Sequence, residues 1–502
     1  MERAASRRAW LRHGALLGAG ALATPWWSGS AHAGQRLPAT PVRQAARSAQ
    51  ALLQGCGLPA SSIGVYARAL DAAEPLVALN PETSFALAST AKLVTSMAAL
   101  DLLGPQFRWR TLAFTRGKLQ DGRLDGDLWI VGGGNALLSS QDLLQWMSQW
   151  RELGLREIAG NIVLDRFAFH LTDSDHERTP LPAPDRPHHN RPDALTVDEG
   201  VLRVSLQSGR SGRMEVQLDP PMAGLAIDQR LVRKGGCSAW AQWEDKTTRG
   251  AAQLRVQGQW SAACGRRQLA AFAPLEQTEF SHRAFAGLWA EAGGVLRGRV
   301  IEQTPSDRPG RFPLDEDGLT QQPFAVHRSA MLPQLLRDIN KTSDNLAARN
   351  LMLALSRGFP ARAATLPAAQ ARMREWLMGQ GLLPDDVQVE NGSGLSRGER
   401  AKPRALVHLL SRAWQTGQAS SLVDSLPVAG VDGTLEHRMR GGAAAGQAWL
   451  KTGTLLDARA LAGYVRSQRG GVYAVTALVN HPDATRAVPA LDGFIEWLAR
   501  NG

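Results

Sequence analysis

Ser89-Thr90-Ala91-Lys92 opens a run of apolar residues at helical spacing that ends at Gly104, and this stretch decides how the rest of the chain is interpreted. The repeat predicts a buried helix with Ser89 at its start. Residues three positions apart share one face of a helix, so Lys92 can reach the Ser89 hydroxyl. A serine hydroxyl is a weak nucleophile until a nearby base takes its proton. The stretch is therefore a candidate nucleophile and base, although a helix-capping serine followed by a solvated lysine would give the same pattern.

Two further motifs follow along the chain, Ser343-Asp344-Asn345 and then Lys451-Thr452-Gly453-Thr454. A lysine acts as a base only when its pKa is lowered, and burial and a neighbouring cation both lower it. Lys451 is the candidate for that cation, and with Thr452 it is predicted to meet a substrate carboxylate. The three motifs together therefore predict a site for acyl transfer to a serine.

The third motif lies in a region with the pattern of β-structure. A strand is predicted over 449–455, followed by a hairpin over 460–467 and 472–479. A strand edge beside the nucleophile can donate a backbone N–H. We therefore predict an oxyanion hole formed by the N–H groups of Ser89 and Thr454, which would hold the negative charge that develops during acyl transfer.

The order of the three motifs resembles that of class A β-lactamases and penicillin-binding proteins. Within this group, the chain is similar to the D-alanyl-D-alanine carboxypeptidases/endopeptidases of the class C, low-molecular-mass penicillin-binding proteins. Three further stretches carry the resemblance, and they are Asn340-Lys341, Asn391-Gly392-Ser393-Gly394-Leu395-Ser396 and the segment 426–435. The similarity runs from about Ala51 to the C-terminus.

The resemblance implies an α/β protein with the penicillin-binding-protein/serine β-lactamase-like transpeptidase fold, in which helices flank an antiparallel sheet. It implies a serine-type D-Ala-D-Ala carboxypeptidase, DD-endopeptidase or both, which acts on the peptide stems of peptidoglycan through an acyl-enzyme on Ser89. β-Lactam antibiotics are expected to be covalent inhibitors, and no cofactor is expected. The balance between the two activities is left open.

The motif residues take their roles from the chemistry above and from the resemblance. The catalytic residues are expected to be Ser89, Lys92 and Ser343, the last as the relay of a proton to the leaving amine. Asn345 is expected to contact both Lys92 and the substrate. The full set of substrate-binding residues is Asn345, Lys451, Thr452, Gly453 and Thr454.

Two alternative functions are weaker. Class A β-lactamases resemble one another in a deacylating glutamate within a Glu-x-x-Leu-Asn segment, which this sequence lacks, and they do not place about 250 residues between the first two motifs. A catalytically silent wall-binding protein with the same fold is disfavoured because all the motif residues are intact. Slow hydrolysis of a penicilloyl-enzyme is the implied behaviour.

A chain of 502 residues exceeds what one hydrophobic core supports. We predict four segments, which are a signal peptide over 1–33, a first catalytic part over 34–110, an inserted β-rich part over 111–280 and a second catalytic part over 281–502. Many short alternating runs predict strands in the insert. Where the family usually shows glycine-aspartate-proline, the insert has Gly132-Gly133-Gly134-Asn135, which is predicted to form a flexible turn.

The first 33 residues have the pattern of an export signal. Arg7, Arg8 and Arg12 precede an apolar stretch over 15–27, and Ala31-His32-Ala33 resembles a cleavage site. The paired arginines are also typical of a twin-arginine signal, so ordinary secretion and twin-arginine export both stay open. Either route predicts a periplasmic protein. No later apolar run reaches the ~18 residues that span a bilayer, so at most peripheral membrane contact is expected.

The three cysteines and the charge fit that compartment. In an oxidising environment Cys237 and Cys264 are predicted to form a disulfide within the insert, with Cys56 left as a buried thiol. The net charge is +11, but no run of five or more Lys or Arg occurs, so no nucleic-acid partner is expected. His170, His176 and the pair His188-His189 lack the helical spacing of a zinc peptidase, so no metal is expected.

Overall fold

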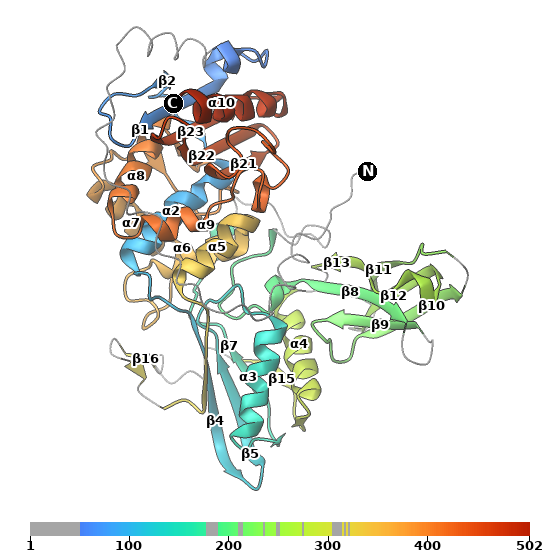
Figure 1. Ribbon diagram of the computed structural model, residues 1–502. Coiled ribbons are helices and arrows are strands. Elements are labelled where there is room, and N and C mark those ends of the chain that lie inside the picture. Colours follow the sequence, from blue (N-terminus) through green and yellow to red (C-terminus); the bar gives the residue numbers. More distant parts are fainter. Residues whose placement is uncertain are drawn as a thin grey trace, which may run out of the picture.

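The computed structural model describes most of the chain after residue 50. The described residues are 51–176, 189–208, 214–233, 236–246, 251–273, 276–303, 314–315, 318–319 and 322–502. The expected signal peptide over 1–33 lies outside them, as does His188. In Figure 1 the upper body is built from both ends of the described sequence, and the lower and right-hand bodies are built from its middle. We call the upper body the catalytic part and the other two together the inserted part.

The catalytic part is centred on a five-stranded antiparallel sheet with the order β2-β1-β23-β22-β21. Its strands are β1 (Ile63–Ala69), β2 (Val77–Leu79), β21 (Ala448–Leu455), β22 (Ala458–Arg466) and β23 (Val472–Asn480). The last three match the strands expected in this region to within two residues. Because β1 pairs with β23, from Ile63 opposite Val479 to Ala69 opposite Tyr473, the sheet joins the two sequence halves.

Alternate residues of the strands face two different cores, because successive side chains in a strand point to opposite sides. Leu461 and Val475 pack with α10 (Val488–Asn501) on one face. Ala460 and Leu478 pack on the other face with α8 (Pro403–Gln415) and α2 (Ala91–Leu102). The observed arrangement is helix, sheet, helix, as expected from the resemblance (Figure 1).

Helix α2 lies at the centre of the helical layer and is buried from Ala91 to Leu100. Around it pack four more helices, α5 (Leu332–Thr342), α6 (Asn345–Ala354), α7 (Leu366–Gly379) and α9 (Ala419–Ser425). Ala91, Leu93, Val94 and Ala98 of α2 have no exposed surface. The helix that carries the first motif is therefore fixed on all sides, which holds its first turn in place.

The inserted part contains a seven-stranded mixed sheet, covered by α3 (Ser140–Glu152) and α4 (Gln277–Glu291). The strands are β4 (Arg110–Gln120), β5 (Arg123–Val131), β6 (Glu157–Ile158), β7 (Ile162–Asp165), β14 (Val295–Leu296), β15 (Val300–Glu302) and β18 (Ala325–Arg328). Three tryptophans pack in this core. Trp146 and Trp150 meet edge to face with ring centroids 4.8 Å apart, and Trp150 and Trp289 are tilted with centroids 5.8 Å apart.

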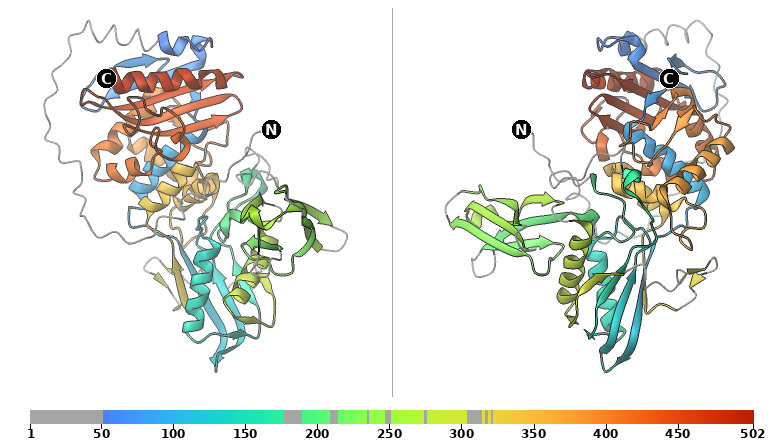
Figure 2. Two further views of the ribbon diagram at one scale, coloured as in Figure 1. Left: turned by 45° about the vertical axis from the view of Figure 1, so that its right-hand side comes forward. Right: turned by 180° about the vertical axis from the view of Figure 1, so that it is seen from behind.

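Two three-stranded sheets project to one side of the inserted part (Figure 2) and share its core, and a two-stranded sheet of β16 (Leu314–Asp315) and β17 (Gly318–Leu319) also belongs to it. The strands of the three-stranded sheets are β8 (Leu202–Ser208), β9 (Met214–Asp219), β10 (Ala226–Arg233), β11 (Trp240–Lys246), β12 (Ala251–Trp260) and β13 (Arg267–Phe272). Cys237 and Cys264 form a disulfide here, with their Cα atoms 5.7 Å apart. Cys56 is a free, partly buried cysteine in the catalytic part.

The inserted part extends further along the sequence than expected. Strand β18 pairs with β4 in antiparallel register, from Ala325 opposite Ala113 to Arg328 opposite Arg110. The expected boundary at residue 280 therefore falls within α4, and the chain returns to the catalytic part only after Arg328. The pattern of β18 indicates a strand but not which sheet it joins, so the sequence alone placed this boundary too early.

The run Gly132-Gly133-Gly134 makes a tightly packed connection instead of the expected flexible turn. A Cβ atom on Gly133 would lie 2.0 Å from the carbonyl oxygen of Arg110, and one on Gly132 would lie 2.5 Å from that of Ala194. Glycine is required here because neighbouring backbone approaches too closely for any side chain.

Across the described ranges, no helix combines the length and the apolar character needed to cross a membrane.

Candidate active site

The nucleophile candidate lies in a single 3-10 turn, Ala88–Thr90, which leads directly into α2. Ala88 adopts a left-handed conformation with φ 46°, which costs a non-glycine residue on the order of 1–3 kcal/mol. The turn directs Ser89 toward the first turn of α2, where Lys92 lies on the same face. Lys92 Nζ donates a hydrogen bond of 3.2 Å to Ser89 Oγ, as the three-residue spacing predicted.

Lys92 is fully buried and has three hydrogen-bond partners. Besides Ser89 Oγ, its ammonium nitrogen donates to Asn345 Oδ1 at 2.7 Å and to the carbonyl oxygen of Ser393 at 2.5 Å. These acceptors come from two other elements, the start of α6 and the loop before β20 (Arg400–Ala401). They hold the lysine in a direction that places its ammonium nitrogen within reach of the candidate nucleophile.

The surroundings of Lys92 also suit the role of a base. Burial lowers the pKa of Lys92 from 10.5 to about 7, while the negative charges of Glu399 and Asp344 act in the opposite direction. Desolvation is the larger effect because a charged amine loses its hydration inside the protein. A lysine with this pKa is partly neutral at pH 7 and can accept a proton from a hydroxyl.

The second motif forms the tight link between α5 and α6. Ser343 is the C-cap of α5 in a left-handed conformation, with φ 61° and ψ 41°. Asp344 is the N-cap of α6, and its carboxylate accepts a hydrogen bond of 2.9 Å from the N–H of Ala347. Asn345 then begins α6, and its side-chain oxygen accepts a hydrogen bond from Lys92. The middle residue of the motif therefore stabilises the helix start, while its neighbours point into the site.

The third motif lies on β21, the edge strand of the five-stranded sheet. Lys451 is fully buried, and its Nζ donates to Ser343 Oγ at 2.9 Å. Thr452 Oγ1 donates to Thr434 Oγ1 at 2.7 Å, so the segment 426–435 supports this strand. The three expected catalytic residues are thus found in two contacts, Ser89 with Lys92 and Ser343 with the substrate-binding candidate Lys451.

Gly453 allows β21 to pack directly against the nucleophile turn. A Cβ atom at this position would lie 2.9 Å from the carbonyl oxygen of Leu87 and 3.0 Å from Ala88 Cβ. The next residue, Thr454, is exposed. The two N–H groups predicted to form the oxyanion hole, those of Ser89 and Thr454, thus belong to neighbouring elements, and their role stays a prediction.

Residues outside the motifs join α5, which leads into the second motif, to α2 and to residues 425–432. Lys341 Nζ binds Asp432 Oδ2 at 2.6 Å and the carbonyl oxygen of Leu426 at 2.9 Å. Asn340 Nδ2 donates to Ser96 Oγ at 3.1 Å and to Ser425 Oγ at 2.9 Å. The stretches 340–341 and 426–435, which carry the family resemblance, therefore fix the helices around the site.

Sequence reasoning missed Glu399, which is fully buried beside the site. Its carboxylate accepts backbone N–H groups from the loop that presents Ser393 to Lys92. Gly394 in this loop has φ 88°, and a Cβ atom there would lie 1.8 Å from the carbonyl oxygen of Ala88. The signal available in the sequence was an acidic residue three positions after the glycine- and serine-rich stretch 391–396.

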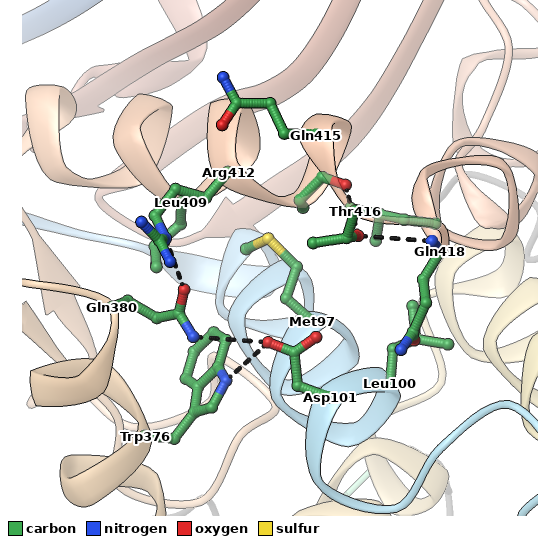
Figure 3. Close-up of a pocket in the computed structure, with 12 residues that line it drawn as sticks. Met97, Leu100, Asp101, Trp376, Gln380, Leu409, Arg412, Gln415, Thr416 and Gln418 are labelled. Carbon is green, nitrogen blue, oxygen red and sulfur yellow. Dashed lines mark hydrogen bonds between the residues drawn. The ribbon is translucent and has the colours of Figure 1, made fainter.

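A separate cavity lies on the side of α2 that carries Met97 and Leu100, and its lining residues are all outside the three motifs (Figure 3). Asp101 Oδ2 accepts hydrogen bonds from Trp376 Nε1 at 2.9 Å and from Gln380 Nε2 at 3.4 Å.

Among the residues that the structure describes, no three His, Cys, Asp or Glu side chains are grouped so that they could hold a metal ion.

Comparison with known proteins identifies relatives over most of the chain. D-alanyl-D-alanine carboxypeptidase DacB of Haemophilus influenzae is 26% identical over 436 residues, which cover 84% of this chain and 85% of that protein. A D-alanyl-D-alanine carboxypeptidase of Actinomadura sp. (strain R39) is 30% identical over 445 residues, which cover 84% of this chain and 78% of the relative.

The fold is shared with a solved structure. Penicillin binding protein 4 from H. influenzae superimposes with a TM-score of 0.68 at 22% identity, over 90% of this chain and 99% of that one. The fold class expected from the motifs is therefore confirmed. Residues 45–500 match the family described as D-Ala-D-Ala carboxypeptidase 3 (S13). With its motifs, fold and relatives in agreement, the chain belongs to this S13 family of D-Ala-D-Ala carboxypeptidases.

Proposed function

We propose that Ser89 is the nucleophile through which this D-Ala-D-Ala carboxypeptidase cleaves the peptide stems of peptidoglycan. One observation carries the proposal: the fully buried Lys92 contacts Ser89 Oγ at 3.2 Å and has a pKa lowered to about 7. A base matched to neutral pH within reach of a hydroxyl is what an activated serine requires.

In the acylation step, Ser89 Oγ attacks the carbonyl carbon of the penultimate D-alanine and passes its proton to neutral Lys92. The carbonyl oxygen takes up negative charge, which the N–H groups of Ser89 and Thr454 would stabilise. Asn345 is hydrogen-bonded to Lys92 and lies at the start of α6, where its amide can also orient the substrate peptide.

Departure of the leaving group requires a proton on its nitrogen. Ser343 lies in contact with Lys451, so its hydroxyl can pass a proton to the leaving amine and take one from Lys451 Nζ, while Lys92 keeps the proton that it took from Ser89. The C–N bond then breaks and free D-alanine leaves. Lys451 and Thr452 provide the charge and the hydroxyl that bind the terminal carboxylate of the substrate.

A water molecule completes the cycle by attacking the ester carbon of the acyl-enzyme, which releases the shortened stem and restores the Ser89 hydroxyl. If the leaving amine belongs to a neighbouring stem, the same steps cut a cross-link. β-Lactams would acylate Ser89 at the first step, because an activated serine beside an oxyanion hole also opens a strained lactam ring.

The periplasm is the proposed site of action. The export pattern over 1–33 would direct the chain across the membrane by the ordinary secretory or the twin-arginine route. The disulfide between Cys237 and Cys264 suits a chain that works in an oxidising compartment. The stem peptides of peptidoglycan occur there, and the excess of basic residues favours an anionic wall polymer. Contact with the membrane would be peripheral.

The test uses two muropeptides, a monomer with a D-Ala-D-Ala end and a cross-linked dimer. Incubation with the purified mature protein, followed by mass spectrometry, should show loss of D-alanine from the monomer, cleavage of the dimer, or both. Ser89→Ala is the matched inactive control. A protein that binds these substrates without turning over either one would be the silent wall-binding alternative, and the proposal would fail.

A further inference from the structure

The loop from Glu390 to Glu399 is fixed to the segment that leads into the nucleophile. The carbonyl oxygen of Glu399 accepts a hydrogen bond of 2.9 Å from the N–H of Leu87, two residues before Ser89. Beyond it, β20 (Arg400–Ala401) pairs with β3 (Phe85–Ala86). The main chain of Glu399 is therefore held against the backbone that positions the candidate nucleophile.

The side chain of Glu399 holds the other end of the same loop. Oε1 accepts the N–H groups of Glu390, Asn391 and Gly392 at 3.2, 3.0 and 2.6 Å. Oε2 accepts the N–H of Gly394 at 2.5 Å. All four of these partners are donors, which suits an ionised carboxylate, because a protonated carboxyl would have to turn its own O–H toward one of them.

The loop shaped in this way carries the acceptor that Lys92 meets. The carbonyl oxygen of Ser393, between two of the bound N–H groups, lies 2.5 Å from Lys92 Nζ. Thr95 Oγ1, one turn further along α2, donates to the carbonyl oxygen of Gly392 at 2.8 Å. The loop is thus clamped between the Glu399 carboxylate on one side and α2 on the other.

Charged groups from several elements surround this arrangement. Glu399 and Asp344, at the start of α6, both favour the ammonium form of Lys92 against the effect of burial. Arg349, a buried residue of α6, is close enough to Glu399 for their charges to interact. Lys451 of β21 is hydrogen-bonded to Ser343 of the second motif. Glu399 is therefore a buried carboxylate beside two buried basic side chains, Arg349 and Lys92, and such partners are what an interior charge requires.

We infer that Glu399 is a positioning residue of the acyl-transfer site, which sets the Ser393 carbonyl against Lys92 and stabilises the ammonium that forms when Lys92 takes the Ser89 proton. The inference rests on the proposed roles of Ser89 and Lys92. Burial raises the pKa of Glu399, while the bound N–H groups and the Lys92 ammonium favour its ionised form. The proton moves from Ser89 Oγ to Lys92 Nζ, and Glu399 keeps its own charge throughout.

Two substitutions separate the charge of Glu399 from its geometry. Glu399→Gln removes the charge at nearly constant shape, and Glu399→Asp keeps the charge but shortens the side chain. Glu390→Gln is the matched control, because this half-buried carboxylate lies on the same loop and binds Ser396 Oγ instead of the loop N–H groups. Acylation of each protein by a fluorescent penicillin is measured from about pH 5.5 to 9, a range that spans the titration of the base.

In the wild type and in Glu390→Gln, the acylation rate should rise with pH around the same midpoint. In Glu399→Gln the midpoint should move to lower pH by about one unit, since loss of a nearby negative charge disfavours the ammonium. Its plateau rate should fall roughly tenfold as the base weakens. Glu399→Asp should keep the wild-type midpoint while its rate falls. A slower Glu399→Gln with an unmoved midpoint would reduce Glu399 to a structural residue and overturn the inference.

A second measurement does not depend on the folding of any variant. In the wild-type protein, hydrogen exchange followed by mass spectrometry should show protected amides over 391–394, compared with the exposed turn at Leu456. Rapid exchange of those amides would overturn the arrangement. If wild-type Ser89 is not acylated at all, the proposed function fails. If it is acylated and the Glu399→Gln midpoint is unchanged, only the present inference fails.

Discussion

Asn345 Oδ1 accepts a hydrogen bond of 2.7 Å from Lys92 Nζ, although 253 sequence positions separate the two residues. The inserted part fills most of that interval. It leaves this contact intact because it departs through β4 and returns through β18, and the two strands pair with each other where Arg110 lies opposite Arg328. An insertion whose two ends meet side by side does not force its host to open.

Benzylpenicillin should acylate Ser89 in the folded protein. The reason is that Ser89 Oγ lies within hydrogen-bonding distance of a base whose pKa is about 7. Mass spectrometry of a digest should find one adduct, on the peptide that contains Ser89, and none in Ser89→Ala. An adduct on another residue, or an unlabelled Ser89 in folded protein, would contradict the assignment.

Lys92→Ala and Lys451→Ala should fail in different ways. Loss of Lys92 removes the base, so the rate constant of acylation should fall at least a hundredfold or so. Loss of Lys451 removes the charge that binds the substrate carboxylate and the partner of Ser343, so the apparent affinity should also fall by roughly tenfold. Stopped-flow acylation over a range of penicillin concentrations separates the two effects. Near-normal behaviour of both variants would exclude the scheme.

The rate of acylation should rise with pH through about 7. Only neutral Lys92 can take the Ser89 proton, and its pKa of about 7 means that the neutral fraction grows from a minor to a major share across that pH. The rate should level off above this range and fall as the pH is lowered below it. A rate that still climbed steeply near pH 10 would indicate a lysine with an ordinary pKa.

Gly394→Ala should lose acylation, whereas Gly381→Ala should not. Both glycines have nearly the same backbone conformation, with φ 88° and 82°, so both substitutions carry the strain of a left-handed residue. Only at Gly394 would the new Cβ also meet a backbone oxygen, that of Ala88 at 1.8 Å, while the space around Gly381 is open. Labelling of both variants by fluorescent penicillin, with thermal unfolding measured alongside, tests the difference.

Removal of the disulfide should weaken the inserted part without affecting the active site. For Cys237 and Cys264, 27 positions apart, the chain-entropy estimate gives roughly 3–4 kcal/mol of stabilisation. The double substitution to serine should lower the unfolding temperature, and penicillin labelling at a permissive temperature should be unchanged. Thiol titration of denatured, unreduced wild type should find a single free cysteine, Cys56. Three free thiols in protein taken from the periplasm would refute the pairing.

The sequence predicted those features that depend on local pattern. The helix after Ser89 has an apolar repeat of its own, and Gly470-Gly471 marks the turn between the last two strand-like runs. The motif trio then specified which elements must meet, because acyl transfer requires a serine, a base and a cation within a few ångströms. The fold class followed from that chemical requirement together with the resemblance.

Other features could not be predicted because they arise from contacts between distant segments. Glu399 looks like a surface residue in the sequence, and its role becomes visible only when the loop closes around it. The glycines at 132–134 look flexible until the backbone of Arg110 and Ala194 is packed against them. The extent of the inserted part depends on β18, a four-residue strand whose partner lies more than 200 positions earlier.

The position of β23 within the five-stranded sheet means that the sheet cannot be completed until the last strands of the chain are present. β23 lies between β1 and β22, so β1 gains this neighbour only after residue 480 has been made. The helix of Ser89 and the whole inserted part leave the ribosome long before that moment. A chain that ends before residue 451 therefore contains Ser89 but neither Lys451 nor a complete five-stranded sheet. We therefore expect a chain truncated before β21 not to be acylated by penicillin, although it contains Ser89 and Lys92.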